Sequence, residues 1–171
     1  CSLDPEKFPV GDRPWWQDFD DCGYNFRMTD IQAAVGSIQL RKLDAMNQRR
    51  IEIADLICEG LEDVPGLTLP IVQPGNKHVF HLFPLRIDAI EFGMNKDQFI
   101  ATMINEHGVK IGTHYIPLHW STAFRRRGSK RGQFPNAEAI FEQQVTLPMH
   151  PRLTNEAVNY LVESIRKCRR R

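Results

Sequence analysis

The segment from Gly23 to Gly36 constrains the fold most, because it joins a polar, aromatic loop directly to a helix. Thr29 is suited to cap this helix, and the side chain of Gln32, three residues later, can reach back to the Thr29 amide, which makes a capping box. Apolar residues then recur at helical spacing as far as about Val64. The chain is therefore expected to build its fold on a long helical segment.

The apolar stripe of this segment changes phase near Leu43 and Asp44, so residues 29–64 are expected to form two consecutive helices or one bent helix. Pro65 and Gly66 end it. Residues 1–28 are interrupted by prolines and glycine and are expected to be irregular. This segment contains three large aromatic side chains, those of Trp15, Trp16 and Phe19. We expect another part of a larger assembly to cover them.

Short apolar runs alternate with helical patterns in the remaining residues, 65–171. Strands are expected at 67–69, 78–87, 109–115 and 145–147. Helices are expected to begin at Asn95, Asn136 and Thr154, each acting as a cap. Pro84 in the second of these strands calls for an edge position or a bulge. Three main strands with helices between them predict an α+β fold, with a small sheet covered mainly on one face.

The net charge of +1 hides an asymmetry along the sequence: residues 1–63 sum to −6 and residues 121–171 sum to +7. Basic clusters at 125–131 and 166–171 can bind phosphates, or they are a solvated loop and tail. Aromatic residues are not interleaved with them, and no known nucleic-acid-binding pattern occurs, so a nucleic-acid partner is not expected.

The sequence also indicates the cellular compartment of the protein. It holds no run of about 18 apolar residues, and its first residues do not resemble a signal peptide, so no membrane partner is expected. The four cysteines are scattered without a C-x-x-C pair. We interpret them as free thiols of a cytoplasmic protein.

The sequence does not contain a self-contained catalytic motif. The six histidines lack metal-ligand spacing, so no metal site is expected. There is also no nucleophile motif and no glycine-rich phosphate loop, so no catalytic residue is assigned.

Two segments are candidates for ligand contact. Asn25 and Arg27 precede the first helical turn, where free amides and the helix dipole favour an anion such as phosphate. His114, Tyr115 and His119 gather polar rings around a proline at the end of an expected strand, where ligands commonly bind. The alternative is that these rings only cover a core edge. Arg125, in the basic loop that follows, can reach an anionic part of the same ligand.

Five segments taken together resemble the C-terminal part of the DegT-type (DegT/DnrJ/EryC/StrS) family of pyridoxal-phosphate-dependent aminotransferases, which act on nucleotide-linked keto sugars. Their order and spacing make the resemblance specific, and it covers nearly the whole sequence. The segments are Gly23 to Ala34, His78 to Leu85, His114 to His119, Phe134 to Glu138, and Leu147 to Pro151 before Leu153 and Thr154.

The resemblance implies the small C-terminal domain of a type I aminotransferase fold, with a three-stranded, mostly antiparallel sheet. Residues 1–28 would be an irregular remainder of the large cofactor domain. Residues 29–64 would be a long bent connecting helix, and residues 65–171 the small α+β domain. The family's Schiff-base lysine lies in an S-x-H-x-x-K type segment upstream of the first matching block, and no such segment occurs in this sequence.

The resemblance also implies roles for the candidate residues. Asn25 would reach across a homodimer to the cofactor phosphate of the other subunit, with Arg27 as its helper or as a structural ion-pair residue. His114, Tyr115 and His119 would approach the sugar nucleotide, together with Arg125. Pyridoxal phosphate would serve the complete enzyme, with glutamate or a similar amino acid as donor.

Whether this chain is an enzyme by itself stays open at this point. Without the lysine, the isolated chain is expected to be inactive and to bind no cofactor tightly; it would pair with a second copy or with the missing large domain. The alternative is a stand-alone interaction module of the same origin, kept for its dimerisation surface.

Overall fold

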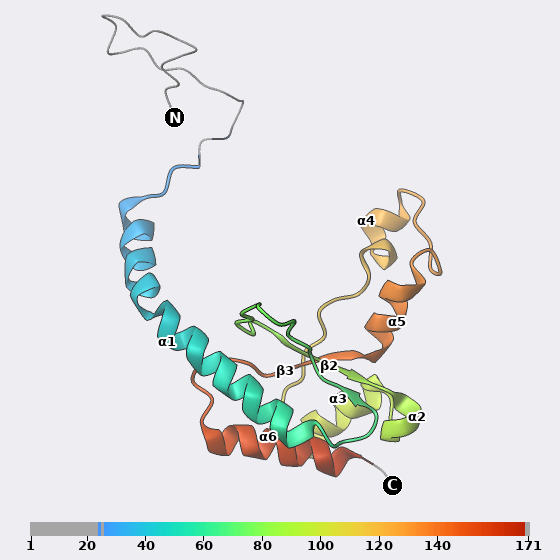
Figure 1. Cartoon of the computed structure of the whole chain (residues 1–171). Helices are drawn as coiled ribbons and strands as arrows, with labels where there is room; N and C mark the ends of the chain where they lie inside the picture. The colour runs from blue at the N-terminus through green and yellow to red at the C-terminus, as the bar shows by residue number, and fades with distance from the viewer. Residues whose placement is uncertain (1–23, 25, 170–171) are drawn as a thin grey trace, which may run out of the picture. The chain divides into compact units, whose positions relative to one another are not determined.

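The computed structural model describes residues 24 and 26–169. The chain divides into two compact units, residues 1–40 and 41–171. Trp15, Trp16 and Phe19 lie outside the described residues. The elements in chain order are α1 (Asp30–Leu61), β1 (Leu67–Thr68), β2 (Phe83–Ile87), α2 (Ala89–Phe92), α3 (Lys96–Asn105), the 3-10 turn η1 (Leu118–Trp120), α4 (Thr122–Arg125), α5 (Pro135–Gln143), β3 (Gln144–Leu147) and α6 (Asn155–Cys168) (Figure 1).

The predicted capping box opens α1. The Thr29 N–H donates to Gln32 Oε1 at 3.0 Å, and the Gln32 N–H donates to Thr29 Oγ1 at 3.3 Å. From there a single helix runs through the phase change to Leu61, so of the two expected arrangements the structure has the single helix. The phase change instead marks where α1 becomes buried: its buried residues all lie in its second half, within the unit 41–171.

The sheet has the order β1-β2-β3 and is antiparallel throughout. Along β2, Phe83, Leu85 and Ile87 are buried, whereas Pro84 and Arg86 belong to the opposite face. The register pairs Leu85 with Val145 and Pro84 with Thr146, so β3 continues the same division of faces. The predicted α+β class and three-stranded sheet are confirmed.

Pro84 lies in the central strand, not at an edge or in a bulge as expected. Thr146, opposite Pro84, uses its backbone N–H and C=O to bond Gly112, at 2.8 and 3.0 Å. The Pro84–Thr146 pair is therefore of the non-hydrogen-bonded type and needs no N–H from the proline. On the other side, β1 ends at Thr68, which pairs with Arg86, so no strand lies beside Pro84 there.

Two expected strands are shorter than the sequence suggested. The run 78–87 becomes extended only at Phe83, because Phe80 has a φ of +45° and its N–H donates to His78 Nδ1 at 3.0 Å. The run 109–115 forms only the single bridge from Gly112 to Thr146. Beyond this bridge the side chain of His114, not the backbone, bonds β3.

The predicted helix caps are partly right. Asn95 and Gln98 form the capping box of α3, and Thr154 Oγ1 accepts the Ala157 N–H at 3.2 Å to cap α6. The expectation that Asn136 caps a helix is wrong. Helix α5 begins one residue earlier, at Pro135, because a proline at the first helical position needs no N–H partner and already has a helical φ.

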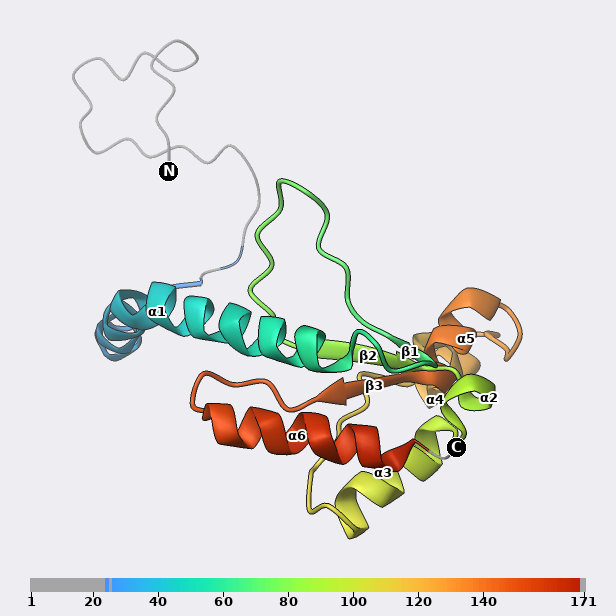
Figure 2. The same ribbon diagram turned by 60° about the horizontal axis from the view of Figure 1, so that its bottom comes forward.

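One face of the sheet carries the core. The second half of α1, α3 and α6 cover it, and α1 and α6 lie side by side (Figure 2). Their close approach depends on Gly60, where a Cβ would lie 2.7 Å from Val162 Cγ1. Arg49 on α1 joins the start of α6, donating to Leu153 O and Asn155 Oδ1, both at 2.8 Å. The opposite face, with Arg86, Gln144 and Thr146, is left for other contacts.

Cys58 and Cys168, the cysteines among the described residues, are both free thiols. Burial, with a smaller effect from Glu106, raises the pKa of Cys168 to about 11. Its sulfur lies 3.5 Å from Met103 Sδ inside the core. Cys1 and Cys22 lie outside the described residues. No helix in the described part of the chain is long and apolar enough to cross a membrane.

The turn between α1 and β1 depends on Gly66. Gly66 and Gly75 have similar left-handed backbones, with φ of +80° and +83°, but a Cβ at Gly66 would collide with the backbone nitrogen of Phe92, whereas Gly75 faces open space. Both alanine variants should lose about 1–2 kcal/mol from backbone strain. Gly66→Ala should lose about 1–3 kcal/mol more from overpacking. Urea unfolding of the two variants measures the difference, and equal losses would contradict this account of the turn.

Candidate functional site

The candidate site lies on the face of the sheet that the core leaves uncovered. Thr146 turns its side chain to this face, and its hydroxyl is hydrogen-bonded to His114 Nδ1 at 2.9 Å. The His114 ring meets the Tyr115 ring edge to face, with centroids 4.7 Å apart. Tyr115 itself is 75% exposed. The Thr146 hydroxyl on β3 therefore fixes the imidazole of His114, and the imidazole packs against a phenol that is open to solvent.

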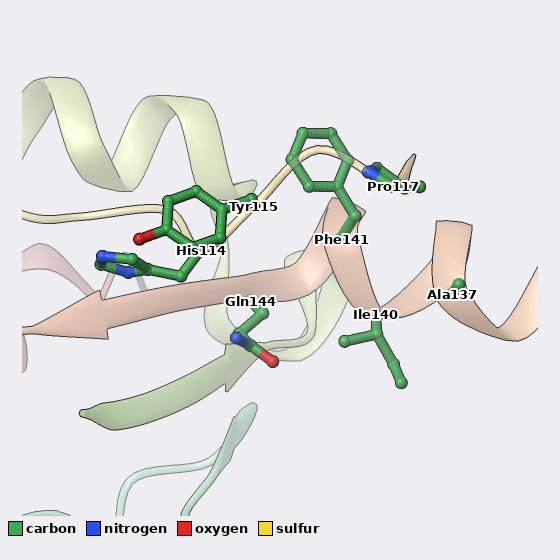
Figure 3. A pocket seen from close by; sticks show the side chains of 7 residues that line it. All are labelled: His114, Tyr115, Pro117, Ala137, Ile140, Phe141 and Gln144. Carbon is green, nitrogen blue, oxygen red and sulfur yellow. The ribbon is translucent and has the colours of Figure 1, made fainter. Parts of the chain in front are cut away.

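These two rings line a cavity of about 240 Å³, which we call the sheet-face cavity (Figure 3). Strand β3 contributes Gln144, and α5 contributes the opposite wall. Polar groups reach the cavity from Gln144, His114 and Tyr115, and the remaining lining is apolar or aromatic. The full lining is His114, Tyr115, Pro117, Ala137, Ile140, Phe141 and Gln144. A mostly apolar cavity with a few polar groups is typical of a small-molecule site.

A second cavity, of about 620 Å³, lies between η1, α4 and α5. We call it the arm cavity. Pro117 and Ala137 line both cavities, so the two are neighbours. The arm cavity is lined by Pro117, Leu118, His119, Phe124, Ser129, Gln133, Phe134 and Ala137.

Glu138 joins the two ends of the segment that carries the arm cavity. His119 is buried, and its Nε2 is hydrogen-bonded to Glu138 Oε1 at 2.6 Å. The same oxygen accepts the Gly132 N–H at 2.6 Å. The hydrogen bond from His119 is the main reason that the pKa of Glu138 lies below its usual range, with a smaller contribution from Gly132 against the opposing effect of burial.

Stacked rings and cations hold the basic loop in place beside this carboxylate. The guanidinium of Arg131 lies 4.2 Å from the centre of the Trp120 ring, which meets Phe141 edge to face at 5.4 Å. Lys96 Nζ lies 3.7 Å from the centre of the Phe141 ring and donates to the Phe141 carbonyl at 2.6 Å. The loop is therefore anchored at Arg131, whereas Arg125, Arg126 and Arg127 are exposed.

The structure brings some of the predicted site residues together and not others. His114 and Tyr115 line the sheet-face cavity, and His119 lines the arm cavity with its Nε2 already bonded to Glu138. Arg125 ends α4 and is exposed, outside the lining of both cavities. Arg27 is exposed in the first unit, two residues before Thr29. Asn25 lies outside the described residues.

Sequence reasoning missed Thr146, Gln144 and Glu138. Thr146 and Gln144 could have been found from strand alternation, since they share a face with Pro84 and Arg86. Glu138 lies in one of the five matching segments, but nothing local in the sequence links it to His119, nineteen residues away. Within the described residues, no group of three or more metal-ligating side chains comes together.

The hydrogen bonds of Glu138 predict a pH-dependent contribution to stability. Because the folded pKa is lowered from its ordinary value of 4.5, the contribution is present above that value and is lost as the pH falls through the lower folded pKa. The Tm difference between wild type and Glu138→Gln should therefore be large near pH 7 and shrink below about pH 4. Glu142→Gln, on an exposed residue of the same helix, is the control. A Tm difference that stays constant down to pH 3 would contradict the prediction.

Comparisons with known proteins connect this arrangement to a family. An uncharacterized protein, MJ1066 of Methanocaldococcus jannaschii, is 37% identical over 167 residues, which are 97% of this chain and 43% of that protein. The dTDP-3-amino-3,4,6-trideoxy-alpha-D-glucose transaminase of Streptomyces venezuelae is 32% identical over 146 residues, covering 85% of this chain and 37% of that one. The chain thus spans about two fifths of the length of these relatives.

The crystal structure of S. venezuelae DesV in complex with a ketimine intermediate is similar to this chain, with a TM-score of 0.78 and 29% identity over 94% of this chain and 41% of that one. The structural neighbours are type I pyridoxal-phosphate aminotransferases, so the predicted fold is confirmed. The predicted relationship is confirmed too, since residues 7–166 match the family described as the DegT/DnrJ/EryC1/StrS aminotransferase family. Because that match covers most of the 171 residues, the chain belongs to this aminotransferase family.

Proposed function

We propose that the complete protein to which this chain contributes transaminates a nucleotide-linked keto sugar, with pyridoxal phosphate as cofactor and glutamate or a similar amino acid as donor. The observation that carries the proposal is the pairing of His114 and Tyr115 on the uncovered sheet face, with the exposed cations of the basic loop in the same unit. Membership of a pyridoxal-phosphate-dependent family supports the cofactor, and the transaminase from S. venezuelae supports the substrate class.

The residues of this chain fit the phosphate end of the cofactor. Arg27 is an exposed cation just before the capped start of α1, and Asn25 adds an amide donor in the same loop. Charged donors beside free helix amides suit a phosphate dianion. We propose that they contact the cofactor bound by a second subunit. When bound, pyridoxal phosphate supplies an electron-withdrawing ring that stabilises negative charge on the reacting carbon.

The side chains on the sheet face would bind and orient the sugar. The Tyr115 hydroxyl can donate to or accept from a sugar hydroxyl, and Gln144 offers both a carbonyl and an amide group to the same cavity. His114 acts through position, because Thr146 holds its imidazole against the Tyr115 ring. His119 would contribute from the neighbouring cavity, and Arg125 would meet the negative charge of the nucleotide.

The reacting lysine, on this proposal, is supplied by another part of the enzyme, and the 171-residue chain alone does not transaminate. Apolar side chains at the start of α1 support the need for a partner, which would be a second copy or the large cofactor domain. Met28, Ile31, Val35 and Ile38 follow one another at spacings of three and four residues and are all exposed.

We place the complete protein in the cytoplasm. A stand-alone interaction module remains the alternative, and a monodisperse, defined assembly of the isolated chain in size-exclusion chromatography would favour it.

Tyr115 should matter for the complete enzyme. Tyr115→Phe removes the phenol hydroxyl. It should lower kcat/KM for the nucleotide sugar by about tenfold, because a sugar hydroxyl then loses a hydrogen bond worth about 1.5 kcal/mol. Tyr160→Phe is the matched control, since that exposed phenol donates to the His107 carbonyl on the core side of the molecule. Equal kinetic effects of the two substitutions would reject the assignment of Tyr115.

The isolated chain provides a separate test of where the reacting amine lies. It is mixed with pyridoxal phosphate, treated with borohydride and measured by intact mass spectrometry. We expect no stoichiometric mass increase, because none of its lysines matches the family's reactive segment. A single lysine modified in full would show that the chain forms the covalent cofactor linkage by itself.

A further inference from the structure

Lys96 is a charged residue that the fold buries. It is the first residue of α3 and is only 5% exposed, and no carboxylate among the described residues forms an ion pair with it. Lysine is rarely buried without a partner, because its ammonium loses its water. The first turn of a helix is also an unfavourable place for a cation, because the helix dipole is positive there. Helix α3 itself therefore gives no reason for a buried lysine at this position.

The end of α5 gives the reason. Helix α5 passes into β3 at Gln144 without an intervening loop, a junction that we call the α5–β3 corner. In a longer helix the Phe141 carbonyl would accept the N–H of Val145, but Val145 pairs with Leu85 in the sheet instead. Lys96 Nζ donates to this carbonyl at 2.6 Å. Because α5 has no basic residue in its own last turn, Lys96 provides the cation that the negative end of its dipole favours.

The same ammonium holds the Phe141 side chain. Lys96 Nζ lies 3.7 Å from the centre of the Phe141 ring, which is a cation–π contact. The ring lines the sheet-face cavity, and Gln144, the first residue of β3, lines it too (Figure 3). Lys96 is therefore bonded to the corner from which both of these lining residues come, although it is not itself part of the lining.

We propose that Lys96 is a positioning residue for the sheet-face cavity: by holding the α5–β3 corner, it keeps Phe141 and Gln144 in place before the sugar binds. A wall that is already ordered avoids the loss of conformational entropy on binding. Lys96 acts only through the backbone and the ring of Phe141 and does not touch the sugar. This inference rests on the proposed function, since it takes the sheet-face cavity as the place that holds the sugar.

The local part of the proposal is tested in the 171-residue chain by the fluorescence of Trp120, whose ring meets that of Phe141 edge to face at 5.4 Å. With Trp15→Phe and Trp16→Phe, Trp120 is the only tryptophan left. Lys96→Met removes the ammonium and keeps an unbranched side chain. It should raise the rate of acrylamide quenching of Trp120 about twofold or more, because the neighbours of a loosened element open more often. Lys96→Arg keeps a cation and a donor and should restore the original rate.

The functional part is tested by steady-state kinetics of the complete enzyme with the keto-sugar nucleotide used for Tyr115→Phe. Lys96→Met should raise KM for this substrate about tenfold and leave kcat within about twofold, because a poorly ordered wall weakens binding without changing the reacting groups. Lys96→Arg should restore most of the KM. If Lys96→Met does not fold, Lys96→Gln removes the charge with a polar side chain and takes its place in both tests.

Two control variants separate positioning from a general loss of stability. Ile165→Val removes one methylene from a fully buried side chain of α6. Lys167→Met removes an exposed cation of the same helix. Both variants should leave the quenching of Trp120 and the KM unchanged. Thermal unfolding shows that each variant is folded and how much its Tm has fallen.

Several outcomes would overturn the inference. Lys96→Met leaves the quenching or the KM unchanged; or it lowers kcat and not the affinity for the sugar nucleotide; or Lys96→Arg behaves like Lys96→Met. A rise in quenching or KM in Ile165→Val that equals the rise in Lys96→Met would also overturn it. If the complete enzyme accepts no keto-sugar nucleotide, the proposed function fails, whereas the quenching of Trp120 still decides whether Lys96 holds the corner.

Discussion

The pairing of β2 with β3 decides which side chains this small domain buries and which it offers to a ligand. Leu85 lies opposite Val145 on the core face, and Pro84 lies opposite Thr146 on the other. A shift of one residue in this register would turn Thr146 into the core and remove the partner of His114. The apolar contacts that stabilise the sheet therefore also fix the position of the candidate site.

The second constraint acts on the basic loop, which has no strand or long helix of its own to position it. A single carboxylate, Glu138, accepts hydrogen bonds from both His119 and Gly132, and Trp120 provides a face for Arg131. His119 and Trp120 precede the loop in the sequence, whereas Arg131 and Gly132 lie at its end, so these contacts join its two ends. Charge repulsion among the arginines is thus opposed at the ends of the loop, and the cations between them remain available to solvent.

Local sequence patterns predicted the structural features that depend only on neighbouring residues, such as helix caps. The caps at Thr29, Asn95 and Thr154 each need only an acceptor and an amide three residues apart, so the sequence was sufficient to find them. The boundaries of the strands were harder, because they depend on distant partners. The run 109–115 looks like a strand, but β3 offers it only one bridge, at Gly112. The site was predictable as a segment, since His114 and Tyr115 are adjacent. Strand alternation can place Thr146 on a face of the sheet, but its pairing with His114 was not predictable, because the two residues are thirty-two positions apart.

Pro84 limits strand pairing in the same sheet that carries the candidate site. A proline in a central strand is tolerated here because Gly112 takes both backbone groups of Thr146 and because β1 stops at Thr68. The short β1 leaves the edge of β2 beside Pro84 unpaired. The bridge from Gly112, at the other edge of the sheet, brings His114 to the Thr146 side chain. A longer β1 would require an N–H that Pro84 does not have. The proline therefore limits the sheet at the edge beside β1, while the glycine bridge at the other edge carries the histidine of the candidate site.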